Sequence, residues 1–171
     1  RKDDLVFVAN GHGGVQVISA SSFSSPYHIG FIKPNGFSRD VKIKGRFAYI
    51  AASYEGIVVA DVLDPTMPIV ATLDTQGVAN RLQIVGDKLY VTDMSGDGGI
   101  SQLNIIDIKD PYNPEMQHVV ELKPARTDLR AKGVFDVAVV GNKAYSTVHY
   151  VTQEDKPAQS IVEITDLGKL D

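Results

Sequence analysis

The chain of 171 residues contains no cysteine. Disulfide bonds, thiolate zinc sites, iron–sulfur clusters and covalent haem attachment are therefore excluded. An excess of positive charge is also missing, since 17 Lys and Arg stand against 21 Asp and Glu and the formal net charge is −4. With no basic stripe in the sequence we expect no nucleic-acid partner. No apolar run approaches the ~20 residues that a membrane-spanning helix needs, so we expect no membrane span.

The sequence does have the composition of a folded domain. Hydrophobic residues make up 43 % and charged residues 22 %, and these ordinary globular values argue against disorder. The chain opens on a strand-like run, with no initiator Met and no signal-like segment. We interpret it as a processed mature chain, a recombinant product or an internal piece of a longer protein.

One short apolar pattern recurs four times along the chain. Each copy is an alternating run with an aromatic residue in the middle, and these aromatics are Phe7, Tyr49, Tyr90 and Tyr145. Their spacings of 42, 41 and 55 residues are typical of a repeat architecture. The runs are bounded by Gly, Asp, Asn and Pro, and no sustained helical period appears. The pattern therefore predicts strands throughout.

The repeat predicts an all-β protein, a β-propeller of four-stranded antiparallel blades with about four repeats. Two blades are complete, with expected strands at 37–44, 47–52, 57–62 and 69–73, and at 78–85, 88–93, 100–108 and 115–122. The chain 1–171 is interpreted as a single propeller domain or fragment, with blades at about 1–36, 37–77, 78–132 and 133–171. The first and last blades have three strands each, which leaves two sheet edges open. We predict part of a larger propeller; closure by a second copy and a self-contained four-bladed ring are the alternatives.

The strand and corner sequences resemble a named repeat. Residues 104–114 (NIIDIKDPYNP) and 58–68 (VVADVLDPTMP) place an apolar strand, an Asp and a Pro-containing corner at the same spacing. In this they are similar to the LVIVD-repeat β-propellers. The resemblance implies a propeller of a kind found in secreted or surface-attached proteins, and hence an extracytoplasmic location. It implies no single activity.

Three charged residues lie at equivalent positions, five residues before the repeat glycines: Asp40, Arg81 and Asp136. In a propeller this position begins the innermost strand, near one mouth of the central channel. A ring of such side chains is suited to bind a polar ligand or a cation. The alternative is structural: a recurrent Asp caps backbone N–H groups of the neighbouring loop, and Arg81 is a departure that pairs with one of them.

A glycine-rich segment has the spacing of a calcium loop. Asp93, Ser95 and Asp97 supply side-chain oxygens at alternate positions, and Gly98 follows, as in the first half of such a loop. The twelfth position, however, is Asn104 and not the bidentate Glu of an EF-hand. The alternative is a hairpin loop whose Asp residues make local turn bonds. Calcium is the one cofactor that the sequence suggests.

Two histidines follow the same strand of the repeat in its first and last copies. His12 and His149 are therefore expected on one propeller face, where they are candidates for a ligand or a shared metal ion; the alternative is two ordinary surface histidines. The same face should collect the loops 10–14, 53–56, 93–99 and 149–159, and the polar stretch 123–132 is expected to form an excursion from the propeller.

The sequence contains no nucleophile elbow and no phosphate-binding glycine loop that opens a helix. We therefore predict a non-catalytic binding or assembly module, which presents its propeller loops to a protein partner, to further propeller repeats or to a small polar ligand. The alternative is an enzyme or a metal-dependent domain with its site at the mouth of the central channel.

Overall fold

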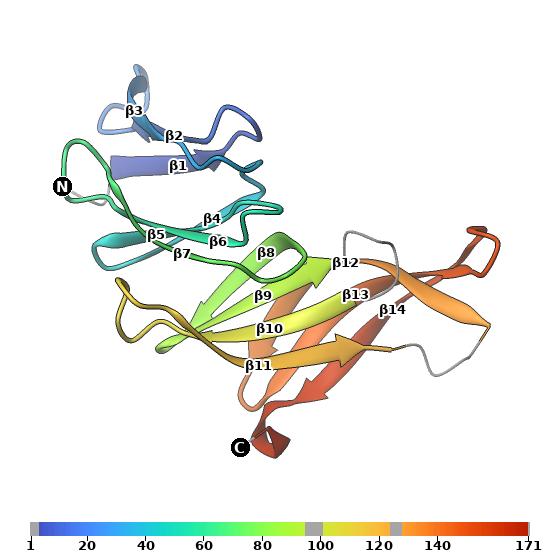
Figure 1. Cartoon of the computed structure of the whole chain (residues 1–171). Helices are drawn as coiled ribbons and strands as arrows, with labels where there is room; N and C mark the ends of the chain where they lie inside the picture. The colour runs from blue at the N-terminus through green and yellow to red at the C-terminus, as the bar shows by residue number, and fades with distance from the viewer. Residues whose placement is uncertain (1–3, 95–100, 124–127, 171) are drawn as a thin grey trace.

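Four antiparallel sheets follow one another in chain order across the molecule (Figure 1). The computed structural model describes residues 4–94, 101–123 and 128–170. Within these ranges the sheets have three, four, four and three strands. The numbers of strands per sheet are those that the repeat predicts. We refer to the four sheets as blades 1 to 4.

The strands of each blade pair in the order in which they occur in the chain. Blade 1 has β1 (Leu5–Ala9), β2 (Val15–Ser19) and β3 (Tyr27–Ile32), and blade 2 has β4 (Asp40–Lys44), β5 (Phe47–Ala51), β6 (Ile57–Asp61) and β7 (Ile69–Leu73). Blade 3 has β8 (Val78–Val85), β9 (Lys88–Met94), β10 (Ser101–Asp107) and β11 (Glu115–Leu122), and blade 4 has β12 (Leu129–Val140), β13 (Lys143–Thr152) and β14 (Pro157–Asp166), followed by the short 3-10 helix η2 (Leu167–Lys169). The predicted bounds of β7, β8 and β11 are confirmed to the residue.

The two-residue turns between the first two strands of blades 2 to 4 need a left-handed backbone. Gly45, Gly86 and Gly141 have φ values of 54°, 58° and 59°, a region that glycine enters without steric cost. Each turn joins an adjacent antiparallel pair, as the sequence predicts.

The hydrophobic core lies between successive blades and is not confined to any one of them. Val15 of blade 1 packs with Ile50 of blade 2, and Tyr49 on the other side of the same strand packs with Leu82 of blade 3. Tyr90 continues the series between blades 3 and 4. Burial raises the pKa of Tyr49 to about 12. The recurring aromatic therefore packs between blades wherever a following blade is present, as expected for a repeated core.

The aspartate that ends the third strand of the repeat holds the corner that follows. Asp61 accepts hydrogen bonds from the Arg46 guanidinium at 2.8 Å and from the Leu63 backbone N–H at 3.0 Å. The bond with Arg46 lowers the pKa of Asp61 to about 2. In blade 3 the equivalent Asp107 accepts from the backbone N–H of Lys109 at 2.8 Å. This Asp of the repeat is thus a structural residue.

Blade 4 departs from the sequence prediction in the length of its strands. Its first strand begins at Leu129, so residues 129–132 belong to β12 and the predicted excursion over 123–132 is wrong for them. The predicted loop 149–159 is also largely strand, since β13 continues to Thr152 and β14 starts at Pro157. Figure 1 shows the resulting hairpin projecting beyond the other blades (orange to red). Polar residues such as Gln159 and Ser160 resemble a loop by composition, but they pair with Tyr150 and His149 of β13 at an exposed edge.

In the part of the chain that the structure describes, no helix is long and apolar enough to cross a membrane.

Candidate functional site

Asp40 links two neighbouring blades. It is the first residue of β4, and its Oδ1 accepts from the Val41 backbone N–H at 2.8 Å and from Lys42 Nζ at 3.1 Å. Its Oδ2 accepts from the backbone N–H of Leu82, in the first strand of blade 3, at 2.9 Å. One carboxylate therefore joins the inner strands of blades 2 and 3.

Arg81 occupies the equivalent position in blade 3 and makes a contact in the opposite direction. Its Nη1 donates to the backbone carbonyl of Arg39, in blade 2, at 2.9 Å. Asp136, the equivalent residue in blade 4, repeats the local bond of Asp40 by accepting from the Val137 N–H at 2.9 Å. Its side chain is exposed, and among the described residues its carboxylate accepts no hydrogen bond from another blade.

A pocket of about 450 Å³ opens where blades 1, 2 and 3 meet, at the end of the inner strands that carries Asp40 and Arg81. It is lined by Ala9 at the end of β1 and residues 10–12 of the loop that follows, by residues 37–39 before β4, and by Asn80 and Arg81 of β8. We call it the mouth pocket. It brings together His12 and Arg81, two of the residues that the sequence singles out.

An aromatic ring organises one wall of the mouth pocket. The imidazole of His12 meets the edge of the Phe37 ring with centroids 5.0 Å apart, and the Arg39 guanidinium lies over the same ring at 5.3 Å. Paired backbone hydrogen bonds of 3.0 Å between Gly11 and Ser38 fix the loop of blade 1 to this segment. Gly11 has a φ of 55°, and a Cβ there would lie 2.6 Å from the Phe37 ring. The close approach therefore requires glycine.

Two residues of the pocket wall were not singled out from the sequence. The Ser38 hydroxyl and Arg39 Nε are buried, and neither makes a hydrogen bond to a described residue. They are the two residues before Asp40 in the chain. A comparison with the residues that precede Arg81 and Asp136 in the other repeats would have shown that Ser38 and Arg39 differ from their counterparts.

His149 does not join His12. It lies within β13, its Nδ1 is 2.9 Å from the Ser160 hydroxyl, and its ring centroid is 6.4 Å from that of Phe135. Because the hairpin of blade 4 is longer than the sequence predicts, His149 lies in a strand and not in the predicted loop 149–159.

Asp93 points into the contact between blades 2 and 3. Its side chain is almost fully buried, and its Oδ2 accepts from Asn104 Nδ2 at 3.3 Å. A Cβ on Gly77 would lie 1.9 Å from Asp93 Oδ1, which shows how closely the backbone approaches the carboxylate. Burial raises the pKa of Asp93 to about 6. Ser95 and Asp97, the other expected calcium ligands, lie outside the described residues, and no group of three His, Asp or Glu side chains suited to a metal occurs among those that are described.

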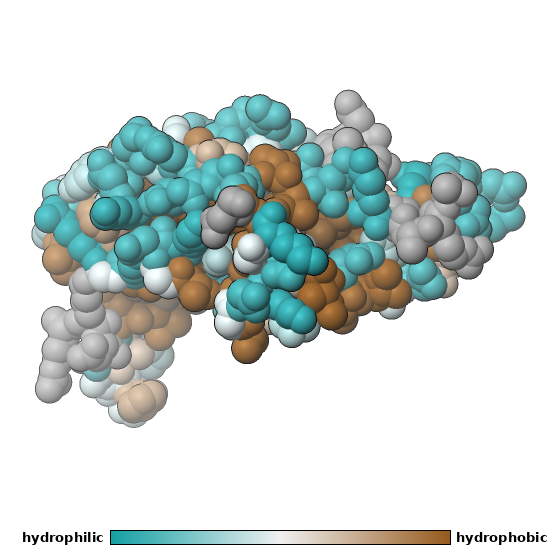
Figure 2. All heavy atoms as spheres, turned by 90° about the horizontal axis from the view of Figure 1, so that it is seen from below, coloured by the Kyte–Doolittle hydropathy of each residue, from teal (hydrophilic) through white to brown (hydrophobic). Residues whose placement is uncertain are grey.

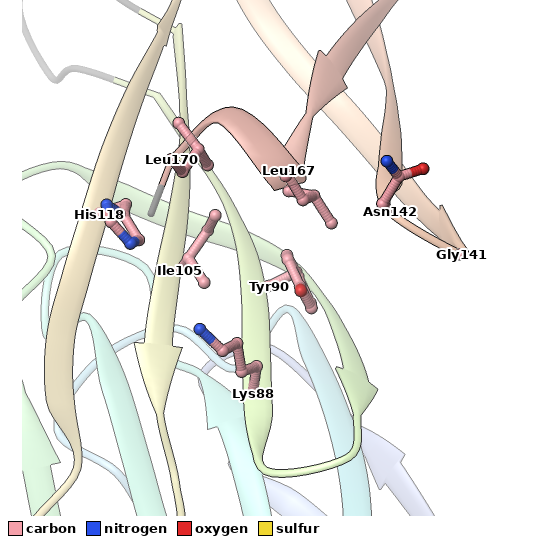
Figure 3. Close-up of a pocket in the computed structure, with 9 residues that line it drawn as sticks. Lys88, Tyr90, Ile105, His118, Gly141, Asn142, Leu167 and Leu170 are labelled. Carbon is pink, nitrogen blue, oxygen red and sulfur yellow. The ribbon is translucent and has the colours of Figure 1, made fainter.

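A second pocket, of about 240 Å³, lies at the opposite ends of the strands, between blades 3 and 4. Figure 3 shows Lys88, His118 and Leu170 around it, and Figure 2 views this side of the molecule, where hydrophobic atoms gather near the middle of the face. Lys88 Nζ donates to Gln117 at 2.7 Å, so its ammonium is already engaged.

The outer face of blade 4 contrasts with the equivalent faces of the preceding blades. Ile105 and Leu103 of blade 3 are 2 % and 0 % exposed, whereas Ile164 and Val162, which pair with β13 in the same way, are 59 % and 55 % exposed. Val140 on β12 is 69 % exposed and adds to this face. We call it the open face of blade 4.

The fold is that of a β-propeller, with successive antiparallel blades of three or four strands among the described residues. A solved structure with the same fold is dihydro-heme d1 dehydrogenase NirN in complex with DHE, a β-propeller with a TM-score of 0.57 and 14 % sequence identity. The match covers 98 % of this chain and 40 % of that chain, so the chain spans less than half of its length. At this identity the likeness shows the fold alone. A comparison with curated proteins gave no match.

The family model of the LVIVD repeat matches residues 35–73 and 76–121, which are blades 2 and 3. The chain thus contains LVIVD repeats in these two blades, as its strand and corner sequences suggest.

Proposed function

We propose that the chain is a non-catalytic binding and assembly module, and that the open face of blade 4 packs against a further propeller blade. The proposal is carried by the exposure of Ile164 and Val162 where their counterparts Ile105 and Leu103 are buried. The burial of apolar side chains on a β-sheet face is favourable, by about 25 cal/mol per Å² of apolar surface removed from water.

The counterparts of Ile164 and Val162 in blade 2 support the same proposal. Val59 and Ile57 stand opposite Tyr49 and Ala51 on β5, and both are fully buried against blade 3. The open face therefore carries the same residue types, in the same register, as the faces of blades 2 and 3 that the next blade covers.

The hydrogen-bonding groups of the open face favour a blade over other protein partners. Asp40 accepts the Leu82 N–H from the first strand of the next blade. Asp136 repeats the local geometry of Asp40 and presents its exposed carboxylate in the equivalent place. A partner that fits needs an inner strand with a backbone N–H at the position of Leu82, and a propeller blade supplies this strand.

We also propose a location for the protein from its repeat family. The LVIVD repeat in blades 2 and 3 supports an extracytoplasmic protein, secreted or attached to the cell surface, because the resemblance implies a propeller of that kind.

The assembly proposal is tested by extending the chain with a blade of known sequence. A second copy of residues 74–123 is joined after residue 171, and the free energy of unfolding is measured in urea for both chains. We expect Asp136→Asn to destabilise the extended chain by about 1.5 kcal/mol more than the original, as for the loss of a hydrogen bond to a charged group. Asp40→Asn is the matched control, since its partner Leu82 is present in both. Equal costs for Asp136→Asn in the two chains would contradict the proposal.

A further inference from the structure

We propose that the mouth pocket binds a small oxyanion, a carboxylate or a phosphate group, through Arg39, Arg81 and His12. These side chains come from three successive blades and line one pocket. The inference does not depend on the open face of blade 4, which lies on another part of the fold.

The charge of the pocket is opposite to that of the chain. The formal net charge of the protein is −4, yet two guanidinium groups and an imidazole line the mouth pocket, and no acidic residue occurs among its described lining residues. Arginine presents its donors in a planar fork that matches carboxylate and phosphate oxygens. Cationic side chains held together without a carboxylate partner repel one another, and an anion between them removes that cost.

The two guanidinium groups are held in place by neutral partners. Arg39 lies over the Phe37 ring at 5.3 Å, a contact that orients a cation without neutralising it. Arg81 Nη1 donates to the Arg39 backbone carbonyl at 2.9 Å, which fixes the position of its guanidinium, and among the described residues no carboxylate forms an ion pair with it. Both cations are therefore positioned before any ligand arrives.

Ser38 gives an independent indication of a ligand. It is 1 % exposed and lines the pocket, and its hydroxyl makes no hydrogen bond to a described residue. A buried polar group without a partner costs roughly 1–3 kcal/mol. The equivalent residues of blades 3 and 4 are the apolar Ala79 and Val134, so the repeat itself does not require a hydroxyl here.

The residues of the pocket are the ones that depart from the repeat. Arg81 stands where blades 2 and 4 have Asp40 and Asp136, and Arg39 stands where blade 4 has Phe135. Functional sites of repeat folds lie in such departures, because the shared residues build the scaffold.

The test is a titration of the isotopically labelled full chain, followed by NMR at constant ionic strength. Inorganic phosphate is added first and succinate in a separate series, with sodium chloride as the reference salt. We expect saturable shifts of the Gly11, His12 and Ser38 amides with at least one of the two anions, and the series that saturates at lower concentration identifies the phosphate or the carboxylate class. Shifts no larger than those in sodium chloride, or shifts that never saturate, would overturn the proposal.

Variants separate a built site from general electrostatic attraction. Arg39→Gln and Arg81→Gln should each weaken binding about tenfold, as expected for a lost charge-assisted hydrogen bond, and Ser38→Ala should weaken it about threefold at unchanged charge. Lys143→Gln removes the same charge from blade 4 and should change nothing. If a Gln variant loses the dispersed spectrum of the folded chain, Arg39→Lys or Arg81→Lys replaces it, since these keep the charge and lose the fork. Equal weakening by Lys143→Gln would refute a specific site.

Discussion

Replacing Asp93 by Asn should stabilise the protein at neutral pH, and the gain should disappear in acid. Burial raises the pKa of this carboxyl group from its ordinary value of 3.8 to about 6. The folded state therefore binds the proton more tightly than the unfolded state between these two values. The stability linked to Asp93 is fully present below about pH 4 and is lost as the pH rises through about 6. A difference of about two pKa units, at roughly 1.4 kcal/mol each, corresponds to about 3 kcal/mol.

The asparagine variant avoids this loss because its amide has no charge to bury. The amide oxygen can still accept the N–H of Val78, which donates to the carboxylate of Asp93. If the Asn104 side-chain amide turns, its Oδ1, which is buried and makes no hydrogen bond to a described residue, accepts from the new amide nitrogen, in exchange for the bond that Asn104 Nδ2 donates to Asp93 Oδ2. We expect Asp93→Asn to raise the free energy of unfolding by up to about 3 kcal/mol at about pH 8, and by far less at about pH 4.

Urea unfolding followed by circular dichroism at the two pH values measures the effect. Asp87→Asn is the control of opposite sign, since the Lys44 ammonium lowers the pKa of Asp87 and its contribution grows as the pH rises. A change in stability for Asp93→Asn that is the same at both pH values would refute the reasoning.

Three further predictions concern packing, acid stability and calcium. Tyr49→Ala empties a buried site between two blades and should cost about 4 kcal/mol in urea unfolding, whereas Tyr145→Ala, on the open face, should cost about 1 kcal/mol; equal costs would contradict the blade contacts. Arg46→Gln removes the partner that lowers the pKa of Asp61 to about 2, so stability present above about pH 4 is lost and acid unfolding should begin at higher pH; an unchanged acid transition in circular dichroism would argue against this ion pair. The calcium loop predicted from Asp93 requires a higher Tm in calcium than in EDTA by calorimetry, and an unchanged Tm rejects it.

The blades were predictable because local physics specifies them. Alternation of apolar and polar residues gives strands, and Gly86 before Asp87 gives the turn that joins β8 to β9, so the bounds of β8 follow from the sequence. Blade 4 was less predictable, because the polar run 153–156 (QEDK) and the Pro157 that follows it suit a long loop as well as the turn of an extended hairpin. Only pairing across the hairpin, seen between His149 and Ser160, decides between the two.

The site was predictable only in part, for a similar reason. Arg81 and His12 could be singled out as departures from the repeat, and the fold brings them to one pocket. The role of Arg39 could not be deduced, since it depends on the Phe37 ring and on a contact with blade 3 that sequence spacing does not specify. The inward direction of the Asp93 side chain could not be deduced either. It depends on the close approach of Gly77 in the neighbouring loop, and spacing along the chain does not reveal that approach.

The most direct test of the central claim, that the open face of blade 4 takes a further blade, is a crystal structure of the chain extended by residues 74–123. The account predicts that Asp136 Oδ2 accepts the backbone N–H of the added residue that corresponds to Leu82, at about the 2.9 Å found for Asp40. It also predicts that Ile164 and Val162 become buried. An added blade that packs elsewhere, with Ile164 still exposed, would contradict the claim.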